Sequence, residues 1–251
     1  MWALRGLRDG VLTTRWPARP DDYATATRGP AVLLDPGGET AGVTELCPTD
    51  AISDDGGLRL DQGRCVQCGR CVAARPELFG WASGPGSAVL ARPALMLPQE
   101  SGTELAGVRA ELATRTAALR RSVHLRHVDA GSDGAEEYEL MALLNPVYDI
   151  HRLGIFFTAS PRHADVLLVT GAGSAGMAEP LRQTYEAMPH PKVVIAVGTD
   201  AVSGGLTGRG GVGELVPVDV WLPGSPPSPF SILHAVLLAV GRLAAGTGDP
   251  R

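Results

Sequence analysis

The sequence predicts an α/β protein in which a small cysteine-bearing unit precedes a domain with a mainly parallel β-sheet. Two observations indicate this architecture. From residue 123 onward, short apolar runs alternate with helical patterns, and the run Val193–Val197 contains no polar residue, as a strand covered on both faces requires. All four cysteines, in contrast, lie in the first third of the 251-residue chain, ahead of a Gly- and Pro-rich stretch from Ser83 to Pro98.

Three segments are expected in chain order. Residues 1–30 form an N-terminal docking arm, which mixes apolar residues with arginines. Such a mixed face suits packing on the chain's own domain or docking on a partner or membrane surface, and the sequence leaves both open. Residues 31–98 form the cysteine-bearing unit, with a strand at 31–34 and a hairpin from Ile52 to Leu60. After Phe79 a loop is expected.

Residues 99–251 form the α/β domain. Its expected strands are 123–128, 155–157, 166–169, 193–197 and 216–222, and its expected helices are 103–122, 136–144, 175–188 and 229–243. Parallel sheets place their chemistry in the loops at the carboxyl ends of the strands. These loops are 129–136, 170–176, 198–213 and 223–229.

The cysteines carry the most specific motif in the chain. Three of them follow a C-x2-C-x2-C spacing, and the fourth precedes Pro48 further upstream. Three thiolates on one tight turn can bind three corners of a cubic iron–sulfur cluster, and a distant Cys-Pro supplies the fourth, as in two-cluster bacterial ferredoxins. We therefore expect one [4Fe–4S] cluster in a ferredoxin-like unit. Its ligands are Cys47, Cys65, Cys68 and Cys71.

Positions that lack cysteine fit the same interpretation. A second cluster would need cysteines at Gly37, Thr40 and Val43 and a Cys-Pro at Arg75-Pro76, so that one site has lost its ligands and the other has kept four. The alternatives are a four-cysteine zinc site and a pair of disulfides. Zinc sites usually use two separated C-x2-C pairs, and disulfides would be unusual in a chain without an export signal. The apolar core of so small a unit is thin, so cluster ligation must supply much of its stability.

Composition excludes several classes of function. The net charge of −5 provides no basic surface for nucleic acid. No apolar run reaches membrane-spanning length, and no signal peptide is recognisable. Residues 171–176 match the dinucleotide pattern G-x-G-x-x-G, but no acidic ribose ligand lies on a strand about 20 residues later, so no nucleotide is expected.

Five short stretches of the α/β domain occur in the order found in one protein family. They are 129–132, 160–165, 191–193, 217–220 and 223–227. Through them, residues 120–243 resemble the family that joins the cluster-bearing B-type subunit of respiratory complex I to the small subunits of membrane-bound group 4 [NiFe] hydrogenases. Residues 129–132 and 163–165 are most similar to the corresponding stretches of formate hydrogenlyase and hydrogenase-4. The N-terminal part separately resembles the ferredoxin subunit of the same complexes, so the chain resembles a fusion of two neighbouring subunits.

One departure from that family is informative. There, the α/β domain binds a proximal [4Fe–4S] cluster through four cysteines, and the matching positions here are Asp133, Glu136, Asp200 and Ser225. Oxygen ligands do not suit the soft iron of a sulfide cluster, so we expect this second site to be empty. Asp133 and Glu136 would then be helix N-terminal acids and Ser225 a turn residue. Alternatively, the three carboxyls bind a divalent cation or relay protons.

The resemblance implies an electron-transfer subunit of a membrane-associated, complex I-like or hydrogenase-4-like oxidoreductase, which is not catalytic alone. Its partners would be a hydrogenase or complex I catalytic-type large subunit and the membrane subunits of the same complex. The chain would be cytoplasmic and peripheral on the inner face of the cell membrane. The alternative is a structural or coupling subunit of a complex that has lost hydrogen chemistry, with a structural or sensory cluster. The missing proximal cysteines favour this alternative, and the retained ones favour a redox role.

Overall fold

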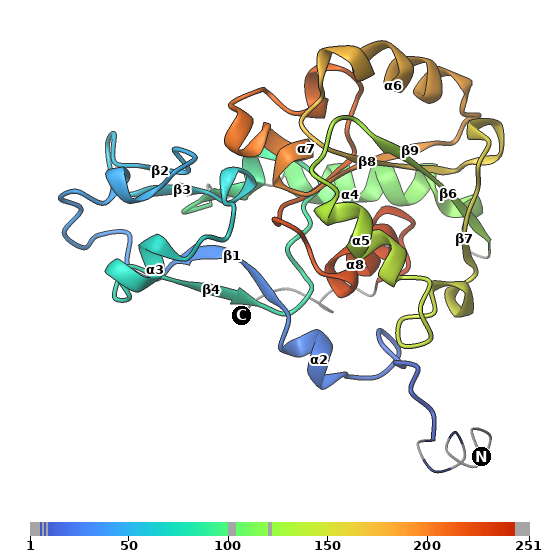
Figure 1. Cartoon of the computed structure of the whole chain (residues 1–251), viewed down its shortest axis with the longest axis horizontal. Coiled ribbons are helices and arrows are strands. Elements are labelled where there is room, and N and C mark those ends of the chain that lie inside the picture. The colour runs from blue at the N-terminus through green and yellow to red at the C-terminus, as the bar shows by residue number, and fades with distance from the viewer. Residues whose placement is uncertain (1–5, 7, 9, 100–103, 120–121, 244–251) are drawn as a thin grey trace.

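The computed structural model describes residues 6, 8, 10–99, 104–119 and 122–243 (Figure 1). A small unit built from short strands lies beside a larger α/β unit. Residues 1–5, 7 and 9 of the expected arm lie outside the described residues. So does Thr103, the first residue of an expected helix. Among the described helices, none is long and apolar enough to cross a membrane.

The larger unit contains a five-stranded sheet in the order β10-β9-β8-β6-β7, with every neighbouring pair parallel. The strands are β6 (Val123–Asp129), β7 (Ile155–Phe157), β8 (Val166–Thr170), β9 (Val193–Val197) and β10 (Val220–Leu222). This confirms the predicted α/β class and parallel sheet. β10 is shorter than the expected strand 216–222, because Pro217 has no backbone N–H for the ladder.

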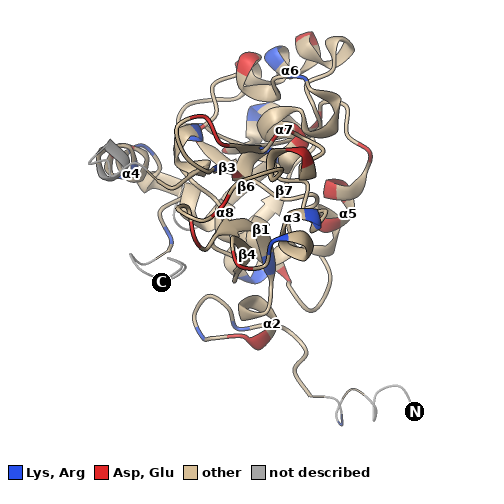
Figure 2. Ribbon diagram, turned by 90° about the vertical axis from the view of Figure 1, so that its left-hand side faces the viewer, with Lys and Arg blue, Asp and Glu red and all other residues tan. Residues whose placement is uncertain are grey.

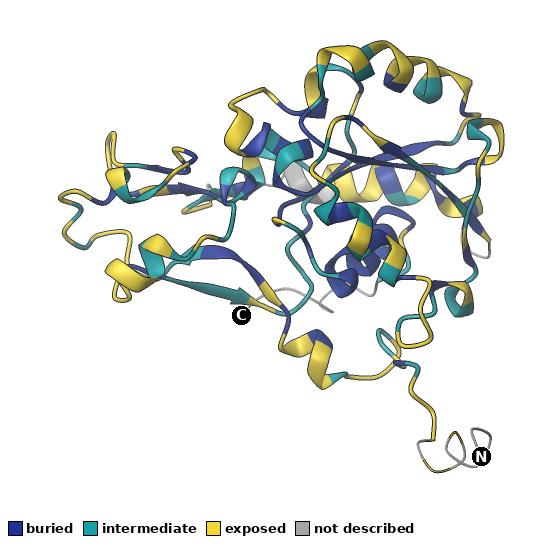
Figure 3. Cartoon of the chain, viewed as in Figure 1, coloured by how far each residue is buried: buried dark blue, intermediate teal, exposed yellow. Residues whose placement is uncertain are grey.

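Helices cover both faces of this sheet. One face packs on α4 (Glu104–Arg115), α5 (Ala135–Ala142) and α8 (Pro229–Ala239) through a large apolar core. The other face packs on α6 (Ala175–Ala187) and α7 (Thr199–Ser203) through a second core. The strands between them are almost wholly buried (Figure 3). The two-sided burial explains why β8 and β9 are apolar at nearly every position.

The small unit has two small antiparallel sheets. β1 (Arg28–Leu33) pairs with β4 (Phe79–Ser83), while β3 (Arg59–Asp61) pairs with β2 (Ile52–Ser53) and β5 (Met96–Leu97). The predicted hairpin is confirmed, but the loop predicted after Phe79 is wrong, because residues 79–83 form β4. Its helices are short, α3 (Arg70–Ala74) and, before β1, α2 (Asp22–Thr25). Much of this unit is exposed or only half-buried (Figure 3).

The N-terminal segment packs on the α/β unit. The Thr14 amide donates to the Val147 carbonyl oxygen at 2.8 Å, and the Thr13 hydroxyl donates to the Pro146 carbonyl oxygen at 2.7 Å. The rings of Trp16 and Tyr148 both meet Phe230 edge-on, with centroid distances of 5.9 and 5.0 Å. Residues 13–16 therefore use the first of the two expected modes, packing on the chain's own domain.

Two aspartates stabilise the amino-terminal ends of the parallel strands. Asp219 donates its amide to the Val194 carbonyl oxygen at 2.9 Å, and its carboxylate accepts the Val194 amide at 2.9 Å. Asp165 makes the same pair of hydrogen bonds with His124, both at 2.8 Å. Asp219 also pairs with Arg115 at the end of α4. Each carboxylate thus satisfies an amide where the regular ladder begins.

We expect Asp219→Ala to lower the free energy of unfolding by about 1–3 kcal/mol, because the Val194 amide loses its charged acceptor. Thermal and denaturant unfolding would measure the change. The matched control is Asp55→Ala at the exposed turn between β2 and β3, which should stay within about 0.5 kcal/mol. Equal effects of the two substitutions would contradict the role of Asp219.

Candidate functional site

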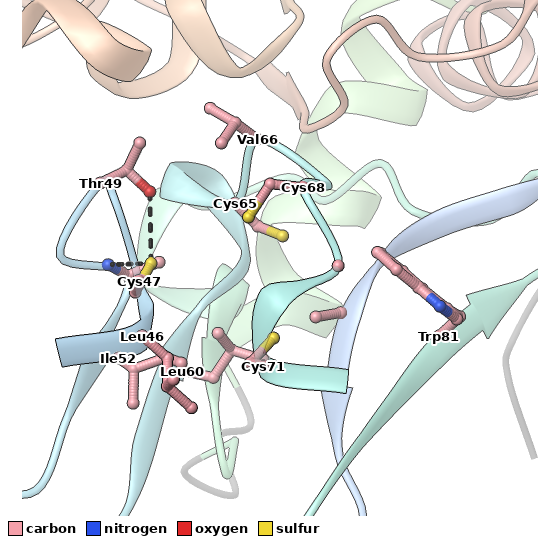
Figure 4. A pocket seen from close by; sticks show the side chains of 13 residues that line it. Leu46, Cys47, Thr49, Ile52, Leu60, Cys65, Val66, Cys68, Cys71 and Trp81 are labelled. Carbon is pink, nitrogen blue, oxygen red and sulfur yellow. Dashed lines mark hydrogen bonds between the residues drawn. The ribbon is translucent and has the colours of Figure 1, made fainter. Parts of the chain in front are cut away.

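All four cysteines line one pocket of the small unit (Figure 4). Cys47 follows a 3-10 turn at Thr44–Leu46, Cys65 follows another at Gln62–Arg64, and Cys71 lies in the first turn of α3. None of the four forms a disulfide, and their sulfur atoms surround a common space in Figure 4. The structure therefore brings together the four ligands predicted from the spacing. The pocket's other walls are Ala31, Leu46, Thr49, Ala51, Ile52, Leu60, Val66, Gly69 and Trp81.

The loop from Cys65 to Cys71 is shaped by two residues in the left-handed region. Gln67 has φ 54° and Gly69 has φ 76°, and Gly69 is the N-cap of α3. A side chain at Gly69 would meet the Trp81 ring at 3.3 Å. Glycine therefore suits both the backbone conformation and the close approach of the ring. This turn directs Cys65, Cys68 and Cys71 to one side of the loop.

Backbone groups are directed at the sulfur atoms. The Ala51 amide donates to the Cys47 sulfur at 3.2 Å, and the Thr49 hydroxyl lies 3.5 Å from the same sulfur (Figure 4). The Thr49 hydroxyl also donates to the Arg64 carbonyl oxygen at 2.7 Å, which ties the Cys47 loop to the turn before Cys65. Amide–sulfur hydrogen bonds of this kind favour a thiolate and tune the potential of a bound cluster.

Burial opposes negative charge in this pocket. Burial raises the pKa of Cys65, and it raises the pKa of Cys71 to about 11, with a further increase from the neighbouring cysteines. These thiols stay protonated at neutral pH unless a cationic centre displaces the protons and pairs with the thiolates. Four thiol donors of this kind suit a soft, positively charged metal centre, such as zinc or an iron–sulfur cluster.

The spacing of the ligands bears on the zinc alternative. Among the described residues, no three cysteine, histidine or carboxylate side chains converge closely enough to hold a single metal ion. A mononuclear site needs its sulfurs about 2.3 Å from one point. A cubic cluster offers a separate iron to each thiolate, so its ligands stand farther apart. The four cysteines line one pocket, and the choice between zinc and a cluster belongs to the proposal below.

The cysteine loop is attached to the carboxyl edge of the parallel sheet. The Thr199 hydroxyl, fully buried at the start of α7, donates to the Cys65 carbonyl oxygen at 2.9 Å. It also accepts the Gly224 amide at 3.2 Å. The Gln67 side-chain oxygen accepts the Ser225 amide at 3.2 Å. Sequence reasoning missed Thr199 and Gln67, since no local pattern distinguishes them from ordinary loop residues.

The four positions expected to be vacant lie at this same edge. Ser225 touches the cysteine loop through its amide, and Asp200 lies in α7. Asp133 is exposed and accepts the Ala135 amide at 3.0 Å, which suits a residue before a helix. Glu136 lies in the first turn of α5 but is only 2% exposed. Burial, with added repulsion from Asp200 and Asp133, raises the pKa of Glu136 to about 7.

The G-x-G-x-x-G stretch has a packing role. Gly171 has φ 79°, and a β-carbon there would come within 2.5 Å of the Gly131 and Ser132 backbone. Gly173 has φ 72° and faces the Gly211 carbonyl oxygen, which a β-carbon would approach to 3.1 Å. These glycines allow three loops to meet at the sheet edge. Close backbone packing therefore accounts for this part of the pattern.

The chain resembles known proteins over its α/β unit. The family described as "NADH ubiquinone oxidoreductase, 20 Kd subunit" matches residues 134–239, from the start of α5 to the end of α8. The chain is 40% identical over 131 residues to a probable membrane-bound hydrogenase subunit of Pyrococcus furiosus, covering 50% of this chain and 78% of that one. It is 36% identical over 163 residues to formate hydrogenlyase subunit 7 of Escherichia coli.

That second match covers 61% of this chain and 63% of the formate hydrogenlyase subunit. A third relative is the B-type subunit of NADH-quinone oxidoreductase from Mycolicibacterium vanbaalenii, which is 47% identical over 104 residues. Here the match covers 39% of this chain and 56% of the relative. The chain thus spans less than two thirds of the length of these two relatives.

Thr199→Val should lower the free energy of unfolding by about 1–3 kcal/mol, because the Gly224 amide and the Cys65 carbonyl lose their partner. Thr199→Ser keeps the hydroxyl and loses one methyl group, so it should cost only about 1 kcal/mol. Thermal unfolding would rank the variants, and amide exchange at Gly224 would locate the effect. A valine variant as stable as the serine variant would contradict this role.

Glu136→Gln should change how stability depends on pH. The folded protein holds the Glu136 proton up to about pH 7, whereas the unfolded chain releases it near 4.5, so wild-type stability falls as pH rises between these values. The variant lacks this loss and should gain up to about 3 kcal/mol relative to wild type at pH 8. Unfolding midpoints by circular dichroism from pH 5 to pH 8 would measure it. Parallel pH curves for the two proteins would contradict the assignment.

Proposed function

Since the chain belongs to the family of the NADH ubiquinone oxidoreductase 20 Kd subunit, we propose that it is an electron-transfer subunit of a complex I-like or hydrogenase-4-like oxidoreductase. One observation carries this proposal: four free cysteines line a single pocket, and their loop is hydrogen-bonded to the family's α/β unit. The α/β unit alone would indicate membership of such a complex. The cysteine pocket adds the means to carry an electron.

The pocket would hold one [4Fe–4S] cluster through Cys47, Cys65, Cys68 and Cys71. When bound, such a cluster supplies reversible one-electron transfer. The chain's own residues would bind it, direct the Ala51 amide at the Cys47 sulfur, and shield the Cys65 side from water. Cys68 is the exposed cysteine, so the pocket is most accessible to an electron-transfer partner on that side.

The domain organisation belongs to the same proposal. Residues 31–98 would be a ferredoxin-type unit fused to the α/β domain of residues 99–251, with residues 1–30 as an arm. The small core of the ferredoxin-type unit contains Cys65 itself, and Cys47 and Cys71 pack against it. Cluster binding would therefore stabilise this unit as well as serve its chemistry.

The α/β unit would hold no cluster of its own. Its four former cluster positions present oxygen atoms, namely Asp133, Glu136, Asp200 and Ser225. Ser225 and Thr199, which precedes Asp200, already form hydrogen bonds with the cysteine loop. Carboxylates and hydroxyls are poor ligands for the iron of a sulfide cluster. The cluster of the small unit would then be the redox centre nearest to this sheet edge within the chain.

The names of the relatives support a set of partners and a location. The similar proteins are named as subunits of formate hydrogenlyase, of a membrane-bound hydrogenase and of NADH-quinone oxidoreductase. The partner on the α/β unit would be a hydrogenase- or complex I-type large subunit, with membrane subunits beneath. The chain would be peripheral on the cytoplasmic face of the membrane.

A second function is favoured by the oxygen-bearing positions in the α/β unit. If the electron path from this chain to the large subunit lacks its proximal cluster, the complex would no longer carry out hydrogen chemistry. The chain would then serve as a structural or coupling subunit. The cluster in the small unit would then be structural or sensory. Reduction of the cluster during turnover of the purified complex supports electron transfer, and a cluster that never changes its oxidation state supports the structural role.

Anaerobic purification of the full chain should yield about four irons and four sulfides, with one EPR signal after reduction. Cys65→Ala and Cys71→Ala should lose most of this iron, since each removes a ligand from the pocket. Asp133→Asn is the matched control and should keep it, because this exposed carboxyl would hold no iron. About eight irons would contradict the vacant second site, and zinc without sulfide would contradict the cluster.

A further inference from the structure

Glu136 is a buried carboxyl that lacks a full set of partners. Its residue is 2% exposed, and its Oε2 atom has no hydrogen-bond partner among the described residues. The side chain lies flat against Gly198, where a β-carbon would come within 2.4 Å of Oε1. A buried unpartnered oxygen costs free energy, and a charged one costs much more. A structural role alone would be filled better by an apolar residue or by glutamine.

The charges that act on Glu136 are negative. Asp133 and Glu137 lie on its own segment and Asp200 on α7, and each adds to the effect of burial on the Glu136 pKa. Figure 2 shows acidic residues on the ribbon around α5 and α7. On α8, which packs against α5, the titratable residue is His234, whose pKa is lowered to about 4 by burial. His234 is therefore neutral and provides no compensating charge.

The other charged groups packed around α7 do not offset the negative charge near Glu136. The turn Gln62–Arg64 packs on α7, but the Arg64 guanidinium donates to the Thr49 carbonyl oxygen at 3.0 Å, on the cysteine side. The turn Val212–Glu214 also packs on α7, and it carries a further carboxyl, Glu214. Glu136 thus has acidic neighbours on two sides, and their repulsion favours its protonated form.

A short covalent and hydrogen-bonded path joins Glu136 to the cysteine loop. Glu136 contacts Gly198, the next residue is Thr199, and the Thr199 hydroxyl donates to the Cys65 carbonyl oxygen. α7 lies on the side of the α/β unit that faces the small unit (Figure 1). The whole path is buried, so charges at its two ends are weakly screened.

We propose that Glu136 is a proton-binding group whose protonation is linked to the oxidation state of the cluster at Cys65. This inference rests on the proposed electron-transfer function. Glu136 takes up one proton from solvent when a low-potential one-electron donor reduces the cluster, and it releases that proton on reoxidation. One positive charge then accompanies one electron, so the net charge of the buried region is unchanged.

The test is an EPR-monitored redox titration of the full chain from pH 5 to pH 9. The wild-type midpoint potential should decrease as pH rises and level off above about pH 8, because an ionised Glu136 disfavours the added electron. Glu136→Gln should give a potential that is independent of pH in this range. Asp200→Asn keeps Glu136 but removes a negative neighbour, so its curve should bend at lower pH.

An infrared difference spectrum, reduced minus oxidised at about pH 7.5, provides a second readout. It should contain the carbonyl band of a protonated carboxyl, and this band should be absent in Glu136→Gln. A wild-type potential that does not vary with pH, or a Gln variant with the wild-type slope, would overturn the inference. If Glu136→Gln does not fold, the Asp200→Asn shift and the wild-type band decide it. A preparation without iron and sulfide would instead refute the proposed function itself.

Discussion

The buried hydroxyl of Thr199 is the point at which the two units of the chain depend on each other. It donates to the Cys65 carbonyl oxygen and accepts the Gly224 amide, so one side chain satisfies polar groups from the cysteine loop and from the loop after β10. Buried backbone groups need such partners, because water cannot reach them. The Gln67–Ser225 contact adds a second link beside it. The cysteine pocket is therefore supported by the parallel sheet as well as by its own small unit.

Desolvation of negative charge shapes both ends of this junction. In the cysteine pocket, burial disfavours thiolates and so makes binding of a cationic centre the condition for ionising Cys65 and Cys71. At the sheet edge, burial disfavours the Glu136 carboxylate, and a proton serves there instead. The same desolvation cost thus acts on the thiols on one side and on the Glu136 carboxyl on the other. Thr199 lies between the two sites.

The two units differ in how much core supports them. The α/β unit has two apolar cores, one on each face of its sheet, and its central strands are fully buried. The small unit has one core of few residues, and cysteines form part of it. A core of that size stabilises a unit only marginally. The small unit is thus held by the sheet edge, by Val89 pairing with Trp221, and by whatever the cysteines bind.

The sequence by itself determined the parallel sheet, most element positions and the four pocket cysteines. Apolar runs such as Val193–Val197 have one compatible environment, and three of the cysteines share one local spacing, to which the distant Cys47-Pro48 adds the fourth. It did not reveal β4, because Phe79–Ser83 is a strand only through pairing with β1. Only the tertiary structure showed that Thr199 and Gln67 join the units and that Glu136 is buried. Those properties depend on residues far away in the chain, which no local pattern encodes.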